Sequence, residues 1–278
     1  MVDVDPRYFA PVAYIGNFAD VSRETIRGME DRLGMSCSSL QGYLAAVRRD
    51  IEDYTAKGNK GFKFGHAYAR DLHFAPRTTA EAEQVYNRII EEGYGWRPVT
   101  LGYNEMRPLQ DYLTHRLMEM AEEYDMPVVF HTGLQTNDLQ HADDARPWRL
   151  WNLPHRFRRV KFILLHAGFP WLEDTALLAK HYPNVYLDMA WTHQMSPELS
   201  TRALEAWVDL VPMNKIIGFG ADQGVVEKVW AHLELAKQDI ARALAKKMSR
   251  ECMSLSRAHA WIAAMLYENP KRIFNLDL

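Results

Sequence analysis

Cysteine is scarce in this chain, and the two that occur, Cys37 and Cys252, form neither a CxxC motif nor a disulfide framework. Disulfide-stapled secreted domains and cysteine-based metal sites are therefore excluded as organising features. A reducing cytoplasm is the expected location. A chain of 278 residues with 47% hydrophobic residues is also long enough to bury a core without covalent cross-links.

The sequence also lacks long apolar runs and a large excess of charge of either sign. No segment reaches the 18 or more apolar residues of a membrane span, and the start of the chain lacks the pattern of a signal peptide. The formal net charge is −3 and no long basic run occurs, so neither nucleic-acid nor membrane binding is indicated. A small-molecule substrate is the expected partner.

No repeats, low-complexity tracts or Gly/Ser linkers divide the sequence, which predicts a single domain over residues 1–278. Strand and helix patterns alternate throughout. Several predicted strands, such as those at 126–131 and 160–166, are apolar on both faces, as buried parallel strands are. The alternation predicts an α/β fold with a parallel sheet.

Three predicted strands end in a side chain that can bind metal or move a proton. The segments MPVVFHTG, VKFILLHAG and KIIGFGAD deliver His131, His166 and Asp222. In barrel folds the catalytic groups sit at the C-terminal ends of the strands. Imidazole with carboxylate suits Zn²⁺, Mn²⁺ or Fe²⁺, and Zn²⁺ is the first expectation. One such histidine alone is more often a structural residue, but three matching strand ends favour a functional site.

The strand endings FHTG, LLHAG and GFGADQG, in that order, resemble the amidohydrolase superfamily. The chain is most similar to its amidohydrolase-related branch, which includes aminocarboxymuconate-semialdehyde decarboxylase, and NVYLDMA and NPKRIFNL agree with that branch. The resemblance implies a (β/α)8 barrel of TIM type and a divalent metal. It implies that His131 binds the metal, that His166 is a second ligand or the acid/base group, and that Asp222 ligates metal and acts as base.

The chain departs from that family in one respect. The family carries a His-x-His pair on its first strand, and no two of the eleven histidines here are two residues apart. Counting back from His131 makes the strand at 61–66 the fourth and that at 12–18 the third. The expectation is thus a barrel lacking its first one or two strands, with residues 1–60 as a diverged or truncated N-terminal part.

Four further residues are candidates for substrate binding. Lys63, His66 and Arg70 follow or lie on the predicted fourth strand, and Arg70 offers a fork that could hold a carboxylate. Trp148 could line the mouth of the site. Each has a plain structural alternative: a buried salt bridge, a surface residue or a helix packed on the barrel. His193 and His232 have no matching context, and a surface or capping role is expected for them.

The function expected from these features is metal-dependent hydrolysis of a small amide, lactone or related carboxylated compound through metal-activated water. A decarboxylase of the same superfamily is the alternative within enzymes. The absent His-x-His also leaves open a catalytically silent barrel that serves as a binding or interaction module. Open barrel edges would then need a partner, which a homo-oligomer could supply.

Overall fold

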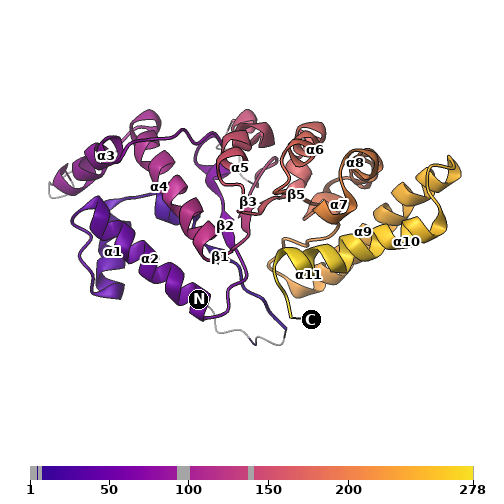
Figure 1. The fold of residues 1–278 in the computed structure, drawn as a ribbon, viewed down its shortest axis with the longest axis horizontal. Coiled ribbons are helices and arrows are strands. Elements are labelled where there is room, and N and C mark those ends of the chain that lie inside the picture. The colour runs from indigo at the N-terminus through magenta and orange to yellow at the C-terminus, as the bar shows by residue number, and fades with distance from the viewer. Residues whose placement is uncertain (1–4, 6–7, 93–100, 137–140, 278) are drawn as a thin grey trace. The chain divides into compact units, whose positions relative to one another are not determined.

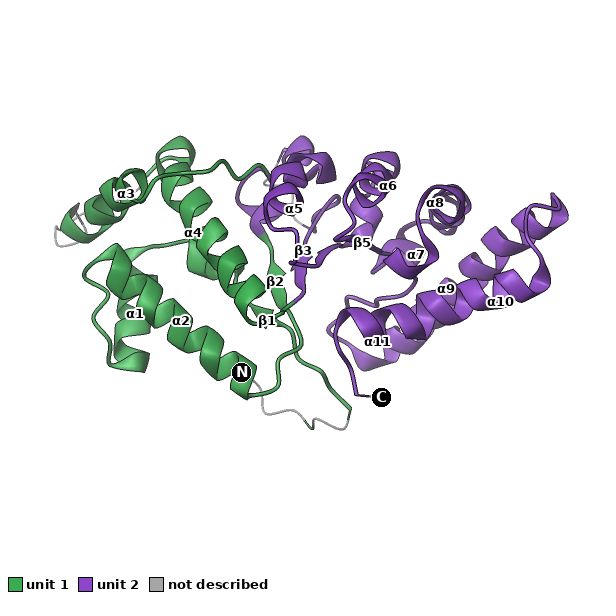
Figure 2. Ribbon diagram, in the orientation of Figure 1, with its two compact units in different colours: residues 1–65, 73–126 green, residues 66–72, 127–278 purple. Residues whose placement is uncertain are grey.

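The computed structural model describes residues 5, 8–92, 101–136 and 141–277. Two compact units make up the chain, coloured separately in Figure 2. The first comprises residues 1–65 and 73–126, and the second comprises residues 66–72 and 127–278. Within the described residues, no helix combines the length and the apolarity that crossing a bilayer requires.

The first unit contains two parallel strands, β1 (Ala13–Tyr14) and β2 (Phe62–Phe64), with Ala13 opposite Phe62. The strand expected at 12–18 is thus only two residues long, because the chain turns into a 3-10 helix at Gly16–Ala19. Four helices complete the unit: α1 (Arg23–Leu33), α2 (Leu40–Ala56), α3 (Thr79–Glu92) and α4 (Tyr103–Glu123).

Local sequence explains where these helices begin and end. Ser22 caps α1 through a capping box with Thr25, and Gly34 ends it in the left-handed conformation. The side chain of Ser39 caps α2 by accepting the Gly42 N–H. Helix α1 packs on α2, and α3 packs on α4.

The second unit contains four strands that pair in chain order, and every pair is parallel. Two of them, β3 and β5, are labelled in Figure 1. They are β3 (Val128–Phe130), β4 (Phe162–Leu164), β5 (Val185–Asp188) and β6 (Ile216–Ile217). Because Val128 pairs with Phe162 and Phe162 with Val185, the first three strands end at nearly the same level. Their C-terminal ends therefore lie at one edge of this sheet.

Helices connect and follow these strands. They are α5 (Asn152–Arg156), α6 (Leu172–His181), α7 (Thr192–Met195), α8 (Pro197–Leu210), α9 (Val226–Ser249), α10 (Leu255–Ala263) and α11 (Asn269–Ile273), with a π-helical turn at Ala264–Glu268. Ser196 caps α8 and Pro197 occupies its first turn, where its missing N–H is tolerated. Helices α8 and α9 pack against each other.

The core of the second unit lies on both faces of its strands. All residues of β3, β4, β5 and β6 are buried. On one face, Val129, Ile163, Tyr186 and Ile217 form a cluster that Ile273 of α11 covers. On the other, the rings of Phe130 and Phe162 stack with centroids 6.2 Å apart. Two-sided burial and parallel pairing confirm the predicted α/β class.

Candidate active site

The exit of each strand in the second unit contains a residue in the left-handed conformation. After β3 it is Gly133 (φ +74°), and after β4, β5 and β6 it is His166 (+60°), Trp191 (+64°) and Asp222 (+48°). Left-handed backbone is costly for side chains other than glycine and tends to concentrate at functional sites. Two of the three predicted site residues are thus held in conformations that the surrounding structure must stabilise.

His131 and His166 meet at the ends of β3 and β4. Nδ1 of His131 lies 3.1 Å from Nε2 of His166, and both rings are almost completely buried. The second nitrogen of each ring faces a main-chain carbonyl: Nε2 of His131 lies 3.1 Å from Leu134 O, and Nδ1 of His166 lies 3.0 Å from Ala190 O. The structure therefore brings together two of the three strand-end residues in direct contact.

These carbonyls fix the tautomers of the two histidines. A carbonyl oxygen can only accept, so Nε2 of His131 and Nδ1 of His166 must carry the hydrogens. In the neutral rings, the two nitrogens that face each other then carry a lone pair each and no hydrogen. Two lone pairs 3.1 Å apart repel unless a cation is shared between them, either one proton or one metal ion. Zinc-binding histidines commonly donate the remaining N–H to a carbonyl or carboxylate in this way.

Asp222 is the third predicted residue, and it comes near the pair from β6. Its Oδ2 lies 3.7 Å from Nε2 of His166, and 55% of its side chain is exposed. Within the described residues, no three His, Cys, Asp or Glu side chains are arranged closely enough to hold a metal ion together. The facing nitrogens of His131 and His166 still fit two positions of a divalent ion, and the carboxylate of Asp222 lies on the side of His166.

An aromatic ring lies against each histidine of the pair. Tyr68 packs on His131 with ring centroids 4.4 Å apart. The rings of Trp191 and His166 meet edge to face, with centroids 6.0 Å apart. The sequence alone did not single out either aromatic residue. Tyr68 comes two residues after the strand predicted at 61–66, whereas Trp191 depends on a left-handed turn that no sequence pattern revealed.

His66 and Arg70 belong to the second unit, as do the strand-end residues. Burial, together with the nearby charge of Arg70, lowers the pKa of His66 to about 3, so its ring is neutral near pH 7. Arg70 is fully buried, and its Nε donates to Asp71 O at 3.1 Å. A substrate carboxylate would reach this guanidinium only if the local packing opened.

The other two predicted substrate residues are Lys63 and Trp148. Lys63 is half-buried in β2 of the first unit. Trp148 lies in a 3-10 helix at Pro147–Trp151, where its ring packs edge-on against His181 of α6 at 6.4 Å. The side chain of Trp148 is also partly exposed, so it packs on α6 and still presents part of its surface to solvent.

Gly133 owes its identity to backbone packing. A Cβ added there would lie 2.3 Å from Phe169 O and 2.6 Å from the carbonyl carbon of Gly168. The Gly133 N–H donates to Ala145 O, and the next residue donates to Phe169 O. Gly133 therefore allows the backbone after β3 to approach the backbone after β4 closely. This contact fixes the two histidines relative to each other.

Comparison with known proteins identifies the family. The amidohydrolase family model matches residues 17–276. The chain belongs to the amidohydrolase family. It is 28% identical to uronate isomerase of Caulobacter vibrioides over 290 aligned positions, which cover 97% of this chain and 57% of that protein. It is 23% identical to protein fluG of Emericella nidulans over 223 positions, covering 78% of this chain and 26% of that protein.

A solved structure shows the same fold. Uronate isomerase of Thermotoga maritima superposes with a TM-score of 0.76 at 17% identity, over 93% of this chain and 59% of that chain. The alternation of parallel strands and helices, together with this likeness, is that of a partial (β/α)8 barrel. The amidohydrolase chain spans from about a quarter to somewhat over half the length of these relatives.

Proposed function

We propose that this chain carries the active site of a metal-dependent amidohydrolase-family enzyme, at the ends of β3, β4 and β6. His131 and His166 hold one divalent cation, Zn²⁺ being the first choice, and Asp222 serves as proton acceptor and further ligand. The observation that carries the proposal is the pair of facing nitrogens, 3.1 Å apart, whose opposite nitrogens each donate to a main-chain carbonyl.

A divalent ion bound there would polarise a substrate carbonyl and lower the pKa of a nearby water toward about 7. The chain's own residues do the rest. Leu134 O and Ala190 O hold the two rings in the tautomers that present lone pairs. The exposed carboxylate of Asp222 is placed to take up a proton beside His166. The rings of Tyr68 and Trp191 shield the pair from bulk water.

The reaction that we propose first is hydrolysis of a small amide, lactone or related carboxylated compound. We propose that substrate binding involves His66, Arg70, Lys63 and Trp148. Arg70 is the group for a carboxylate once the packing around its buried guanidinium opens. A second candidate is isomerisation of a uronate, which the 28% identity to a uronate isomerase over 97% of the chain favours. A uronate is a small carboxylated compound, as are some of the substrates proposed first, and both reactions move a proton that Asp222 could accept.

The test begins with metal-free protein to which Zn²⁺, Mn²⁺ or Co²⁺ is added. Hydrolysis is measured on a panel of carboxylated amides and lactones, and isomerisation on glucuronate. The proposal expects metal-dependent turnover in one of the two assays and a loss of at least about a hundredfold in Asp222→Asn, because the proton acceptor is removed.

The matched control is Glu234→Gln, which neutralises a surface carboxylate on α9 that pairs with Lys237. It should keep full activity. Activity that is unchanged in Asp222→Asn would refute the proposed role of this residue. Absence of metal binding under every loading condition would instead support a silent barrel that acts as a binding module.

A further inference from the structure

Residues 218–221 lead from β6 to Asp222, and three of their four carbonyl oxygens contact a nitrogen from another part of the chain. Gly218 O lies 3.0 Å from Nε2 of His193, and Gly220 O accepts the Trp191 N–H at 2.8 Å. Ala221 O accepts from Nδ1 of His232 at 3.2 Å. The backbone just before Asp222 is therefore fixed by two side chains and one main-chain N–H from other parts of the sequence.

His193 is the first of these anchors, and its environment contradicts the surface or capping role expected from the sequence. It lies on α7 with only 2% of its surface exposed. Its Nδ1 lies 2.9 Å from Oδ2 of Asp239, a completely buried carboxylate on α9. The ring thus bridges a carboxylate and the Gly218 carbonyl.

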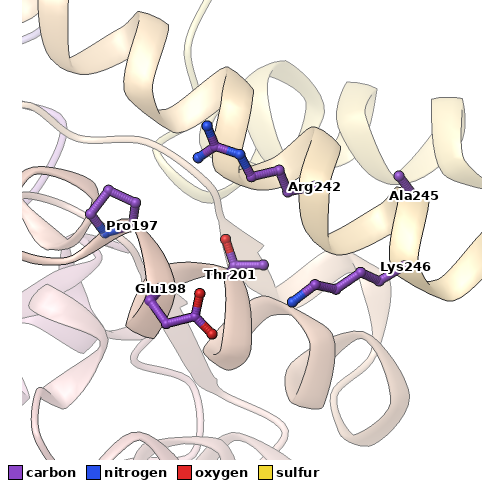
Figure 3. A pocket seen from close by; sticks show the side chains of 6 residues that line it. All are labelled: Pro197, Glu198, Thr201, Arg242, Ala245 and Lys246. Carbon is purple, nitrogen blue, oxygen red and sulfur yellow. The ribbon is translucent and has the colours of Figure 1, made fainter.

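The other oxygen of Asp239 is also occupied. Arg242 donates to its Oδ1 at 2.9 Å. The guanidinium lies at the edge of a hollow of about 380 Å³ between α8 and α9, where Figure 3 shows it across from Thr201 and Glu198. The chain of contacts thus runs from a surface cation through Asp239 and His193 to the carbonyl after β6. Such a network is rigid because each buried polar group has a partner.

His232 is the second anchor, and it comes from the same helix as Asp239. The two residues are seven positions apart on α9, which is close to two full turns, so they share one face. His232 is 9% exposed, which again differs from the expected surface role. One face of α9 therefore holds the segment near both of its ends, directly at Ala221 and through His193 at Gly218.

Two glycines show how closely the segment is packed. A Cβ on Gly220 would lie 2.7 Å from the Cβ of Ala190, the residue whose carbonyl accepts from His166. A Cβ on Gly218 would lie 2.9 Å from the Cβ of Met265, and the Gly218 N–H donates to Met265 O. The segment has little freedom to shift without disturbing the turn after β5, which also supports His166.

We propose that His193, with its partner Asp239, and His232 are positioning residues for Asp222. They hold the backbone from Gly218 to Ala221 and so keep the Asp222 carboxylate beside Nε2 of His166. The inference rests on the proposed function for the role of Asp222, whereas the anchoring of the backbone stands on the contacts alone.

Hydrogen–deuterium exchange on the metal-free protein tests the anchoring. His232→Leu removes one anchor, and His232→Asn can restore it because the Asn side-chain N–H₂ occupies a place similar to Nδ1. We expect exchange in peptides spanning 218–222 to rise about fivefold in His232→Leu, as for the loss of one hydrogen bond, and to return toward the wild-type rate in His232→Asn. Peptides carrying His131 should not change.

The matched control is His259→Leu, which alters an exposed histidine on α10. Asp239→Asn examines the first anchor, His193, with the unfolding midpoint measured in parallel. Unchanged exchange at 218–222 in His232→Leu would overturn the anchoring. A uniform rise in exchange over all peptides would also overturn it, because it would indicate general loosening.

Zinc affinity of the same variants tests the consequence for Asp222. Loss of an outer-shell partner typically weakens metal binding by about 10–100-fold, and we expect about tenfold in His232→Leu with rescue in His232→Asn. Exchange that rises while zinc affinity stays at the wild-type value would overturn the link to Asp222. If Asp222→Asn binds zinc as the wild type does, the metal-ligand role in the proposed function fails, whereas the exchange result still decides the anchoring.

Discussion

Nδ1 of His131 and Nε2 of His166 face each other at 3.1 Å, while the opposite nitrogen of each ring points at a carbonyl oxygen. The two rings come from neighbouring parallel strands whose registers align Phe130 with Leu164. The sheet therefore sets the spacing of the strand ends, and the carbonyls of Leu134 and Ala190 set the tautomers. Together they leave two ring nitrogens facing each other, and the proposal of one shared cation rests on this arrangement.

Gly133→Ala is expected to destabilise the protein by about 2 kcal/mol or more. The residue has φ +74°, and the added Cβ would meet backbone atoms of Gly168 and Phe169 that cannot move aside. Left-handed backbone alone costs a side chain roughly 1–2 kcal/mol. The free energy of unfolding in urea provides the measurement.

Gly28→Ala is the matched control for that substitution. Gly28 lies within α1, and an added Cβ would meet no atom within 4 Å. Alanine there should stabilise the helix by about 0.5–1 kcal/mol, because glycine loses more backbone freedom on folding. Equal effects of the two substitutions would contradict the packing described for Gly133.

His66 should remain neutral in the folded protein from pH 7 down to about pH 4. Burial and the charge of Arg70 lower its pKa to about 3, whereas an unfolded chain would protonate this ring near pH 6.5. Between these two values the unfolded state binds the proton and the folded state does not. The contribution of His66 to the free energy of unfolding therefore decreases as the pH falls through that window.

The measurement is the unfolding free energy of wild type and His66→Gln as a function of pH. The wild type should lose stability relative to the variant between about pH 6.5 and pH 4. NMR titration of the histidine ring signals offers a second reading. A His66 signal that titrates near pH 6.5 in the folded protein would contradict the burial of this ring.

Lys215 predicts a pH effect on the alkaline side. Its Nζ is buried and donates to Ala179 O and Tyr182 O, both at 2.7 Å, near the C-terminal end of α6. Burial lowers its pKa from 10.5 to about 8. Between pH 8 and 10.5 the unfolded state binds a proton that the folded state lacks, so stability rises with pH in this window.

Lys215→Met removes this titration, and the difference between wild type and variant isolates it from other groups. The wild type should gain up to about 3 kcal/mol relative to the variant as the pH rises across the window, at about 1.4 kcal/mol for each pKa unit. Urea unfolding at pH 7.5 and pH 9.5 measures most of the change. A constant difference would show that Nζ is solvated in the folded state.

The sequence revealed the parts of the site that are local. An apolar strand followed by a polar residue is a short-range pattern, so His131, His166 and Asp222 could be singled out, and the parallel sheet explains why they converge. The family assignment is confirmed by the match over residues 17–276. That the whole chain forms one domain stays a prediction.

The supporting contacts could not be predicted because they are long-range. His193 and His232 lie in helices without any motif, and their partners Gly218, Asp239 and Ala221 are 11 to 46 positions away. The left-handed backbone conformation at Trp191 and Asp222 could not be predicted from the sequence either. This conformation is locally unfavourable for any residue with a side chain, and only tertiary packing enforces it.

The central claim, that His131 and His166 share one cation, is tested most directly by calorimetric titration of the metal-free protein with Zn²⁺. The account predicts one ion bound per chain, with affinity reduced more than about a hundredfold in His131→Ala and in His166→Ala. This exceeds the roughly 10–100-fold typical of an outer-shell loss. His259→Ala, on the exposed face of α10, should bind as the wild type does. Equal zinc affinity in the wild type and in both site variants would contradict the account.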